Sequence, residues 1–347
     1  LIDVTVTDSD PELAAEIANA TATSFTSAVQ NTIERPAEEG GASPVQVTVT
    51  QPATTPIEPS SPNIPLYVAI GALLGLAFGI GIAVLRSVLD TRIHTLHDLE
   101  QLTDKPMLGG IAFDSEASKR PLIVHADPRS PRAESFRTLR TNLQFLNVEN
   151  GPRSFVISSA GPGEGKSTTT ANLAIALAET GARVALIDGD LRLPRVADYM
   201  GLEGGVGLTD VLIGRVQLVD AVQKWGQNQL FVLTSGPVPP NPSELLGSTA
   251  MDNVLATLTE HFDYVLIDAP PLLLVTDAAV LSKKTRGVIM VAASGRTKKQ
   301  ELAGAFRPLE TAGGALLGVV VTMLPTRGPD SYGYGSYTYG STPPVDQ

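Results

Sequence analysis

Three short segments of this chain place glycines, a lysine, hydroxyls and aspartates in the order expected of a nucleotide site. Residues 160–168 read Ala-Gly-Pro-Gly-Glu-Gly-Lys-Ser-Thr, residues 187–192 read Ile-Asp-Gly-Asp-Leu-Arg, and residues 265–271 read Val-Leu-Ile-Asp-Ala-Pro-Pro. The first is typical of a phosphate-binding loop, because it joins a β-branched run to a helix-like run, and N–H groups at a helix N-terminus bind phosphate. The other two end apolar runs with aspartates that can approach a metal ion. Unrelated strand–turn junctions are the alternative, but three in this order favour a site for ATP or GTP with Mg²⁺.

The residue types in these segments indicate how they would share the chemistry. Glycines let the first segment wrap closely around phosphates, a lysine adds positive charge, and a serine hydroxyl can hold Mg²⁺. The residues predicted to bind the nucleotide are Gly161, Pro162, Gly163, Glu164, Gly165, Lys166, Ser167 and Thr168. The predicted catalytic residues are Lys166, Asp188, Asp190 and Arg192, and the predicted metal ligands, direct or through water, are Ser167, Asp190 and Asp268. For Arg192, a role at the transition state and a structural pairing are equally open.

Length and composition limit the classes of protein to consider. At 347 residues the chain is long enough for two domains. Its net charge of −11 argues against a nucleic-acid partner, and without cysteine it can form neither disulfides nor thiolate metal sites. The chain begins at Leu1, without Met, inside a run that alternates like a strand, so we expect it to be a fragment cut within that strand.

Residues 66–85 form an uncharged stretch between Pro65 and Arg86. A helix that crosses a bilayer needs roughly 20 such residues, and this stretch lies too far from the N-terminus to be a signal peptide. A buried helix of a soluble domain is the alternative. Because the nucleotide site lies C-terminal to the stretch and ATP is cytoplasmic, residues from Arg86 onward are predicted to be inside the cell and residues 1–65 outside it.

The segment before this stretch has a pattern of its own. Residues 1–7 and 45–50 alternate as strands do, and residues 11–33 read as a helix with one apolar face. Prolines then recur every third residue, which matches the three residues per turn of a polyproline II spacer: Pro56, Pro59, Pro62 and Pro65. We therefore expect the end of an α+β domain followed by a stiff entry into the membrane.

Residues 1–85 resemble the C-terminal part of Wzz-type chain-length determinants of bacterial polysaccharides. The remainder resembles bacterial tyrosine kinases (BY-kinases), which are often fused to that membrane module. The resemblance is most specific in the three nucleotide motifs and in residues 239–246, Pro-Pro-Asn-Pro-Ser-Glu-Leu-Leu. It implies ATP and Mg²⁺ as cofactors, the bacterial plasma membrane as location, and a further membrane span upstream. It also implies the polysaccharide polymerisation and export machinery and an opposing tyrosine phosphatase as partners.

Details of the nucleotide motifs relate them to the kinases, with one departure. ParA/MinD-type ATPases carry a signature lysine near the start of the phosphate loop, where this chain has Gly161. Asp188 and Asp190 flank one residue, as in the kinases; on a strand they would face opposite ways, so one is expected in the turn beyond it. The resemblance favours Asp188 as the base that accepts the tyrosine proton. Related enzymes often have an asparagine that contacts adenine where this chain has Thr322, so the adenine contacts stay unassigned.

A charged stripe lies on the helix-like segment 131–146. Glu134, Arg137 and Arg140 recur at every third residue and so share one side of a helix. A solvated helix face with an internal ion pair is the default interpretation of such a stripe. The resemblance instead assigns these residues to the assembly of kinase domains into a ring.

The C-terminal tail concentrates four of the chain's seven tyrosines. They are Tyr332, Tyr334, Tyr337 and Tyr339, and glycine and serine between them disfavour a packed core. A low-complexity tail that associates with itself is the alternative. The resemblance to the tyrosine clusters of BY-kinases implies that these residues are phosphoacceptors offered to a neighbouring active site.

The apolar runs of the second half indicate its fold. Continuous apolar runs that alternate with helix-like segments are typical of strands covered by helices on both faces. The expected strands are residues 155–159, 184–187, 230–234, 264–267, 287–291 and 317–321. We predict an α/β P-loop NTPase fold with a mostly parallel, doubly wound sheet, similar to ParA/MinD proteins, with the ligand at the C-terminal strand ends. The expected parts are an outer domain (1–52), a proline-rich entry (53–65), a membrane span (66–85), a juxtamembrane linker (86–130), a kinase domain (131–325) and a tail (326–347).

The resemblance as a whole predicts a membrane-anchored autokinase. Such an enzyme would transfer the γ-phosphate of ATP to tail tyrosines of neighbouring subunits and so regulate exopolysaccharide or capsule polymerisation and export. A membrane-tethered ParA/MinD-like ATPase that phosphorylates nothing is one alternative. A structural co-polymerase whose nucleotide site only aids assembly is another. The tyrosine-rich tail argues against both.

Overall fold

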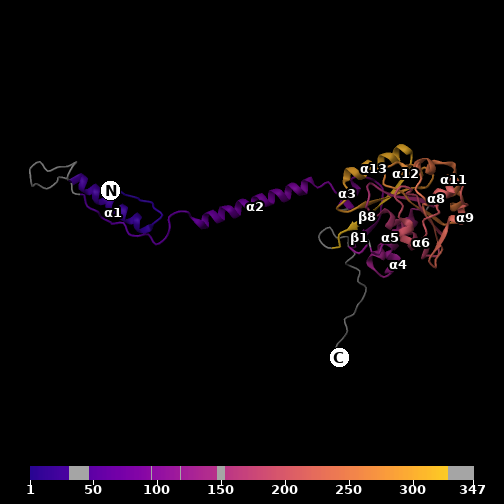
Figure 1. Cartoon of the computed structure of the whole chain (residues 1–347), viewed down its shortest axis with the longest axis horizontal. Helices are drawn as coiled ribbons and strands as arrows, with labels where there is room; N and C mark the ends of the chain where they lie inside the picture. The colour runs from indigo at the N-terminus through magenta and orange to yellow at the C-terminus, as the bar shows by residue number, and fades with distance from the viewer. Residues whose placement is uncertain (31–46, 95, 118, 147–152, 327–347) are drawn as a thin grey trace, which may run out of the picture. The chain divides into compact units, whose positions relative to one another are not determined.

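The structure is a computed structural model that describes residues 1–30, 47–94, 96–117, 119–146 and 153–326. The chain divides into two compact units, Leu1–Val88 and Leu89–Gln347, and each is described by itself (Figure 1). The four tail tyrosines predicted as phosphoacceptors lie outside the described residues.

The N-terminal unit contains helix α1, Pro11–Ala28. Asp10 caps it by accepting hydrogen bonds from backbone N–H groups of its first turn, and proline occupies the first helical position, where no N–H is needed. The side chain of Asn19 exchanges two 2.9 Å hydrogen bonds with the backbone of Ala53, so the chain after the helix returns alongside it. The strands expected at residues 1–7 and 45–50 do not form in the described residues. A strand needs a hydrogen-bonding partner, and in the described part of this unit neither run has one.

Helix α2, Ile64–Leu89, follows the proline-rich segment. It contains the expected span 66–85 and continues for a further turn through Arg86. Its 26 residues are long and apolar enough to cross a membrane, and none of them is buried within the protein. An apolar helix without a protein core to cover it is consistent with a lipid environment.

The second unit is built on an eight-stranded sheet with the strand order β1-β8-β7-β2-β6-β3-β5-β4. All neighbouring strands run parallel except β4 and β5, which are antiparallel. The strands are β1 Met107–Ala112, β2 Ser154–Ser159, β3 Val184–Asp188, β4 Gln223–Trp225, β5 Leu230–Leu233, β6 Tyr264–Asp268, β7 Gly287–Ala293 and β8 Leu316–Leu324. The predicted α/β fold with a mostly parallel sheet is confirmed, and all six expected strands are present.

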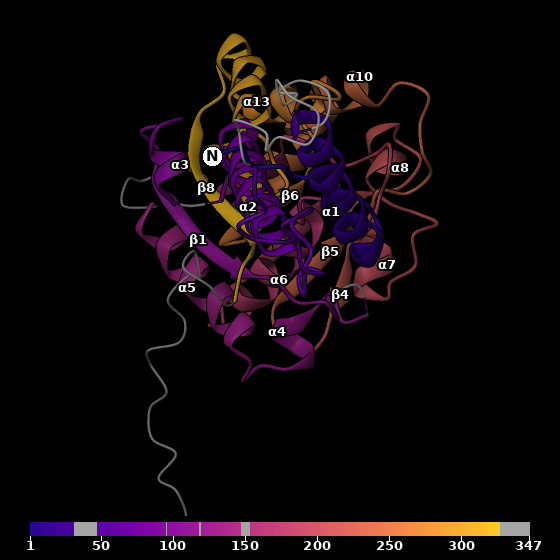
Figure 2. The same ribbon diagram turned by 90° about the vertical axis from the view of Figure 1, so that its left-hand side faces the viewer.

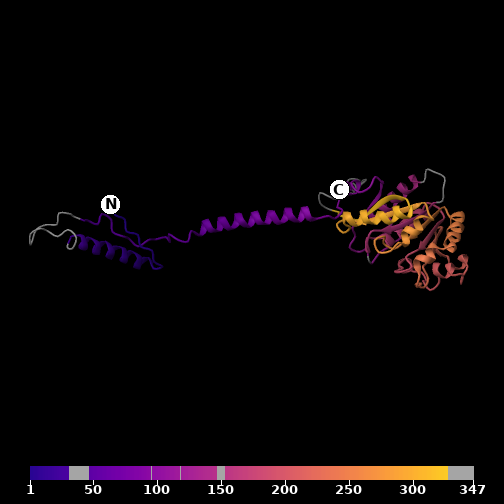
Figure 3. The same cartoon turned by 90° about the horizontal axis from the view of Figure 1, so that it is seen from above.

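Helices cover both faces of this sheet. They are α3 Leu96–Glu100, α4 Ile123–Ala126, α5 Pro131–Phe145, α6 Lys166–Ala178, α7 Val196–Met200, α8 Leu208–Leu212, α9 Leu218–Ala221, α10 Pro242–Gly247, α11 Thr249–His261, α12 Asp277–Ser282 and α13 Lys299–Ala312. One apolar cluster lies under α4, α5 and α6, and a second lies under α11, α12 and α13. Neighbouring strand residues such as Leu186 and Ile187 point into opposite clusters, which explains why the central strands are apolar throughout. Figures 2 and 3 show the unit from two further directions.

Of the expected linker at residues 86–130, the part from Leu89 onward belongs to the second folded unit. It contains α3, β1 and α4, and β1 pairs with β8 at the edge of the sheet. Helix α5 packs on β1 so closely that a Cβ atom at Gly109 would lie 3.2 Å from the Cβ of Leu139. Glycine at this position permits the contact, but glycine also weakens the strand signal in the sequence, which is why β1 was not predicted.

Candidate active site

The phosphate loop occupies the turn between β2 and α6, as predicted. Helix α6 begins at Lys166, and Gly165 precedes it as the N-terminal cap with φ = 90°. Gly163 also has a positive φ, 72°, a conformation that side chains with a Cβ rarely adopt. The loop therefore curls so that N–H groups at the start of α6 are available to an anion.

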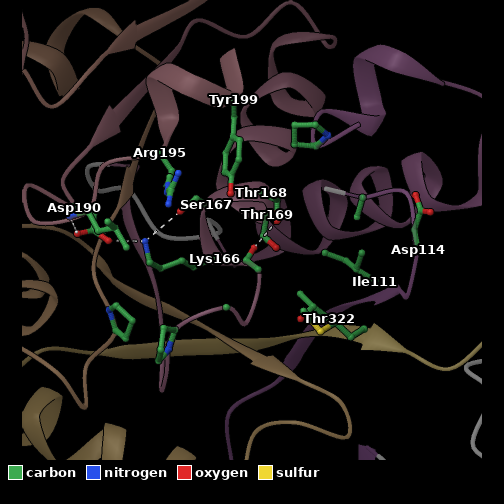
Figure 4. Close-up of a pocket in the computed structure, with 18 of the residues that line it drawn as sticks. Ile111, Asp114, Lys166, Ser167, Thr168, Thr169, Asp190, Arg195, Tyr199 and Thr322 are labelled. Atoms are coloured by element: carbon green, nitrogen blue, oxygen red, sulfur yellow. Dashed lines mark hydrogen bonds and ion pairs between the residues drawn. The ribbon is translucent and has the colours of Figure 1, made fainter. Parts of the chain in front are cut away.

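The ammonium group of Lys166 lies at the centre of the site (Figure 4). Its Nζ is 2.8 Å from Oδ2 of Asp190, 3.4 Å from Oδ2 of Asp268 and 3.1 Å from Oγ of Ser167. Strands β3 and β6 are neighbours and pair Asp188 with Asp268, so both motifs reach the same edge of the sheet. The structure thus brings together residues from all three sequence motifs.

Burial and charge shift the ionisation of these groups. Burial and the nearby carboxylate of Asp268 raise the pKa of Asp188 to about 7. Burial likewise raises the pKa of Asp268, although Lys166 opposes that shift. For Lys166, burial alone would lower the pKa, but the carboxylates of Asp268 and Asp190 outweigh it and raise the pKa. One permanently charged lysine among three buried aspartates leaves negative charge that a divalent cation could neutralise.

Asp188 and Asp190 do not have the same surroundings. Both carboxylate oxygens of Asp188 accept backbone hydrogen bonds, from the N–H groups of Asp190 (3.2 Å), Arg195 (3.1 Å) and Val196 (3.0 Å). Asp190 lies in the turn after the strand, as expected for one of the pair, and lines the pocket. Asp188 therefore fixes the turn that presents Asp190.

Arg192 makes a structural pairing. Its Nε lies 2.8 Å from Oδ2 of Asp277, which is fully buried at the start of α12, and its Nη2 is 3.1 Å from the Ser243 hydroxyl. Ser243 also donates to Asp277 and belongs to the motif at residues 239–246. This motif thus joins the turn after β3 to α12. Arg192 lines the pocket as well, so a second role toward a ligand stays a prediction.

A pocket of about 800 Å³ opens beside the phosphate loop. Its wall includes residues that sequence reasoning missed, because they lie on or beside the unpredicted strand β1 or far along the chain: Phe113, Asp114, Arg132, Tyr199 and Met323. Phe113 directly follows β1 and is 57% exposed. Nε of Arg132 is a buried donor that has no hydrogen-bond partner within the described part of the chain. This wall therefore offers an aromatic surface to a ligand.

Thr322 also lines the pocket, at the position where an adenine contact was in question. Its Oγ1 donates to the backbone oxygen of Glu164 at 2.6 Å and approaches that of Ala292 at 3.4 Å. Thr322 is 5% exposed, so its hydroxyl is committed to holding the phosphate loop.

The oxygen donors at the site fit Mg²⁺. Within the described ranges, no group of three or more His, Cys, Asp or Glu side chains is arranged to hold a metal by itself. Mg²⁺ does not need such a cage, because it usually takes one or two carboxylates together with phosphate oxygens and water. The Ser167 hydroxyl and the carboxylates of Asp190 and Asp268 are donors of this kind.

The charged stripe on α5 lies away from this cluster, toward the C-terminal end of α6. Nη1 of Arg137 pairs with Oε2 of Glu134 at 3.0 Å, and its Nη2 donates to the Pro128 carbonyl at 2.7 Å. Nη1 of Arg140 donates to the Ala176 carbonyl at 3.0 Å. Within one subunit the stripe thus contains the internal ion pair of the default interpretation, and its role in assembly stays a prediction.

Comparisons with known proteins agree on one relationship. A family model described as an AAA domain matches residues 153–297. The chain is 43% identical over 216 residues to the tyrosine-protein kinase YwqD of Bacillus subtilis, covering 62% of this chain and 91% of that protein. It is 30% identical over 307 residues to the tyrosine-protein kinase Etk of Escherichia coli K12, covering 83% of this chain and 42% of Etk. That alignment is longer than residues 89–347, so it includes part of the N-terminal unit as well.

Solved structures give the same result. The kinase domain of the Escherichia coli tyrosine kinase ETK superimposes with a TM-score of 0.64 at 30% identity, covering 70% of this chain and 97% of that domain. The chimerical protein CapA2B2 superimposes with a TM-score of 0.62 at 40% identity, covering 67% of this chain and all of the other.

Proposed function

Because this chain belongs to the bacterial tyrosine kinase family, and is thus a protein-tyrosine kinase, we propose that it transfers the γ-phosphate of ATP to tail tyrosines of neighbouring copies of itself. The observation that carries this proposal is the buried ammonium of Lys166, held between the carboxylates of Asp190 and Asp268 at the mouth of a phosphate loop. Such a cluster is suited to the polyanionic end of ATP with its metal ion.

The proposed reaction forms a bond between the tyrosine oxygen and the γ-phosphorus and breaks the bond to the bridging β,γ-oxygen, so that ADP leaves. Phosphoryl transfer depends on positioning and charge neutralisation more than on covalent help from the protein. Lys166 would exchange its contacts with Asp190 and Asp268 for phosphate oxygens, while N–H groups of residues 163–168 hold the rest of the phosphate chain.

Mg²⁺ would be held by Ser167, Asp190 and Asp268, directly or through water. When bound, the ion supplies neutralisation of the charge that develops on the leaving phosphate. The protein's own contribution is to keep these three oxygen donors on adjacent elements: the start of α6, the turn after β3 and the end of β6.

Asp188 is the proposed acceptor of the tyrosine proton, following the family resemblance. Both of its oxygens already accept backbone hydrogen bonds, so this role requires one of those bonds to be exchanged for the tyrosine hydroxyl. Asp190 lines the pocket; its Oδ1 accepts a single backbone hydrogen bond, from Leu193 at 3.0 Å, and its Oδ2 accepts from Lys166 Nζ at 2.8 Å. Asn substitution at each position decides between them: the true base loses turnover while its variant still binds Mg-ADP, whereas a metal ligand loses Mg²⁺-dependent nucleotide affinity.

The wall formed after β1 is the proposed adenine site. Aromatic side chains stack on nucleobases, and Phe113 presents an exposed ring in the pocket. This contact would replace the asparagine contact that Thr322 cannot supply.

The phosphoacceptors are proposed to be Tyr332, Tyr334, Tyr337 and Tyr339. A ring held through Glu134, Arg137 and Arg140 would bring one subunit's tail to the next subunit's site. Each phosphate adds roughly −1.5 to −2 charges to a chain whose net charge is already −11. The modified tails of neighbouring subunits would therefore repel one another and favour disassembly.

We further propose that α2 crosses the plasma membrane with the kinase unit inside the cell, and that assembly and disassembly regulate exopolysaccharide polymerisation and export. A tyrosine phosphatase would reset the cycle.

A mixing experiment tests transfer between subunits. An inactive Lys166→Met protein with an intact tail is combined with an active protein that lacks residues 331–347, and Mg-ATP is added. The expected result is phosphotyrosine on the tail of the inactive protein, at a rate that rises with concentration. If that tail stays unmodified while the full-length active enzyme labels itself regardless of dilution, transfer occurs within one chain. ADP release without any phosphotyrosine would instead support the ATPase alternative.

A further inference from the structure

A buried pair of side chains connects the phosphate loop to the loop at residues 294–298, between β7 and α13. Oγ1 of Thr297 donates to Oε1 of Glu164 at 2.6 Å and accepts from the Ala293 N–H at 2.8 Å. The other carboxylate oxygen of Glu164 accepts from the N–H of Ala160 at 3.0 Å. Glu164 is 4% exposed and Thr297 is 1% exposed. The carboxylate therefore links the start of the phosphate loop, its middle and the neighbouring loop.

A second contact joins the same two loops. Nη1 of Arg296 donates to the backbone oxygen of Gly163 at 3.1 Å. A Cβ atom at Gly163 would lie 3.5–3.6 Å from the guanidinium, an ordinary contact distance, so the φ of 72° and not this contact is what favours glycine here. Arg296 and Thr297 thus contact consecutive residues of the phosphate loop, Gly163 and Glu164.

The loop at residues 294–298 is itself held by residues 91–94, which follow α2 directly in the chain. The Ile93 N–H donates to the Thr297 carbonyl at 2.9 Å, and the Gly295 N–H donates to the Ile93 carbonyl at 2.7 Å. Nη1 of Arg92 donates to the Gly295 carbonyl at 2.9 Å, and an antiparallel bridge joins Arg92 to Lys298. Ile93 is fully buried, so this is a packed attachment and not a surface contact.

A buried carboxylate is costly, and this one has no role in the transfer described above. Its charge is compensated by hydrogen bonds. The phosphate loop that contains it has two glycines with positive φ, and glycine has more backbone freedom than any other residue. Hydrogen bonds to an ionised acceptor are roughly twice as strong as neutral ones. A charged acceptor at Glu164 is therefore well suited to hold the glycine-rich phosphate loop in one conformation.

We propose that Glu164 and Thr297 are positioning residues that keep the phosphate loop in its nucleotide-binding shape, and that residues 91–94 support this pair through the loop at residues 294–298. The segment that leaves α2 is thereby connected to nucleotide affinity by direct hydrogen bonds. The inference rests on the proposed binding of nucleotide by the phosphate loop, but not on the identity of the phosphoacceptor.

Calorimetric titration of the full-length protein in detergent with Mg-ADP tests the pair. Thr297→Val removes the hydroxyl at nearly constant size and is expected to weaken Mg-ADP binding by roughly tenfold, the value of one hydrogen bond to a charged group. Thr297→Ser keeps the hydroxyl and is expected to bind normally, which separates the lost bond from a folding defect. Arg183→Ala, which removes an exposed ion pair with Asp263 elsewhere, is the matched control for a surface arginine.

A double-mutant cycle tests the support from residues 91–94. Arg92→Ala is expected to weaken binding about threefold, and the Arg92→Ala/Thr297→Val protein about as much as Thr297→Val alone, because the route runs through Thr297. Normal Mg-ADP affinity in Thr297→Val overturns the inference. A roughly thirtyfold loss in the double variant, the product of the two single effects, overturns the proposed support from residues 91–94. If the unaltered protein itself does not bind Mg-ADP, the proposed function fails and this inference fails with it.

Discussion

The Lys166 cluster and the stripe on α5 both combine acidic and basic side chains, yet their surroundings differ. At Lys166 the charges are nearly inaccessible, with the lysine 13% and Asp268 0% exposed, and carboxylates outnumber the cation. On α5, Glu134 is 60% exposed and each arginine has a partner within the subunit. Buried charge without an equal counter-charge is costly unless a ligand supplies one. Charge near the surface that is paired or solvated does not need a ligand. The difference identifies the first region as a binding site and leaves the second dependent on a partner to acquire function.

The largest expected effect is at the lysine. Lys166→Met should reduce tyrosine phosphorylation by at least about a thousandfold, because the charge that binds the transferred phosphate is lost. Phosphotyrosine on the purified protein, measured by mass spectrometry after incubation with Mg-ATP, is the readout. Lys224→Met is the control, since this lysine is exposed on the edge strand β4. Substantial phosphotyrosine in Lys166→Met would contradict the assignment of the site.

Asp268→Asn should separate activity from stability. We expect roughly a hundredfold loss of phosphorylation, because a proposed metal ligand is lost. Burial raises the pKa of Asp268, which means that its ionised form is held at a cost. Neutral asparagine should therefore raise the stability of the ligand-free protein, seen as a higher melting temperature. A lower melting temperature would show that the pairing with Lys166 outweighs the cost of burial.

Phe113 directly follows β1 and lines the pocket. Phe113→Ala should raise KM for ATP by roughly tenfold while leaving kcat within a few-fold, since stacking on a base is worth about 1–3 kcal/mol. Phe145→Ala, which removes another exposed phenylalanine at the end of α5, is the matched control. Equal KM values for the two variants would exclude Phe113 from the adenine site.

The smallest effect on the isolated subunit is expected at the stripe. Arg137→Ala combined with Arg140→Ala should change the free energy of unfolding by no more than about 1 kcal/mol, as is usual for partly exposed ion pairs. If the stripe mediates assembly, the same protein should sediment as smaller species than the unaltered protein. Unchanged sedimentation would leave the stripe with its internal role alone and remove it from the proposed ring.

The nucleotide motifs could be predicted because each is local: a glycine-rich turn, or an aspartate at the end of an apolar run. The positions of β1 and Phe113 could not, because Met107–Ala112 contains two adjacent glycines, and the close packing of Gly109 against α5 is visible only in three dimensions. The pairing of Arg192 with Asp277 was open for the same reason, since the two residues meet only when α12 is packed beside the turn after β3. The prediction of strands near the N-terminus was wrong because alternation of apolar and polar residues specifies the faces of a strand but provides no partner strand.

The close packing at Gly109 has a mechanical consequence. The side chain of Asn142 donates to the Leu108 carbonyl at 2.8 Å, and Arg132 pairs with Asp114 at 3.1 Å, so α5 and β1 are fastened at both ends of their contact. These contacts link α5, which carries the charged stripe, to β1 and the aromatic residue that follows it, Phe113. A molecule that bound the stripe would therefore also restrain Phe113. By reciprocity, a nucleotide bound at Phe113 would favour binding of that molecule to the stripe.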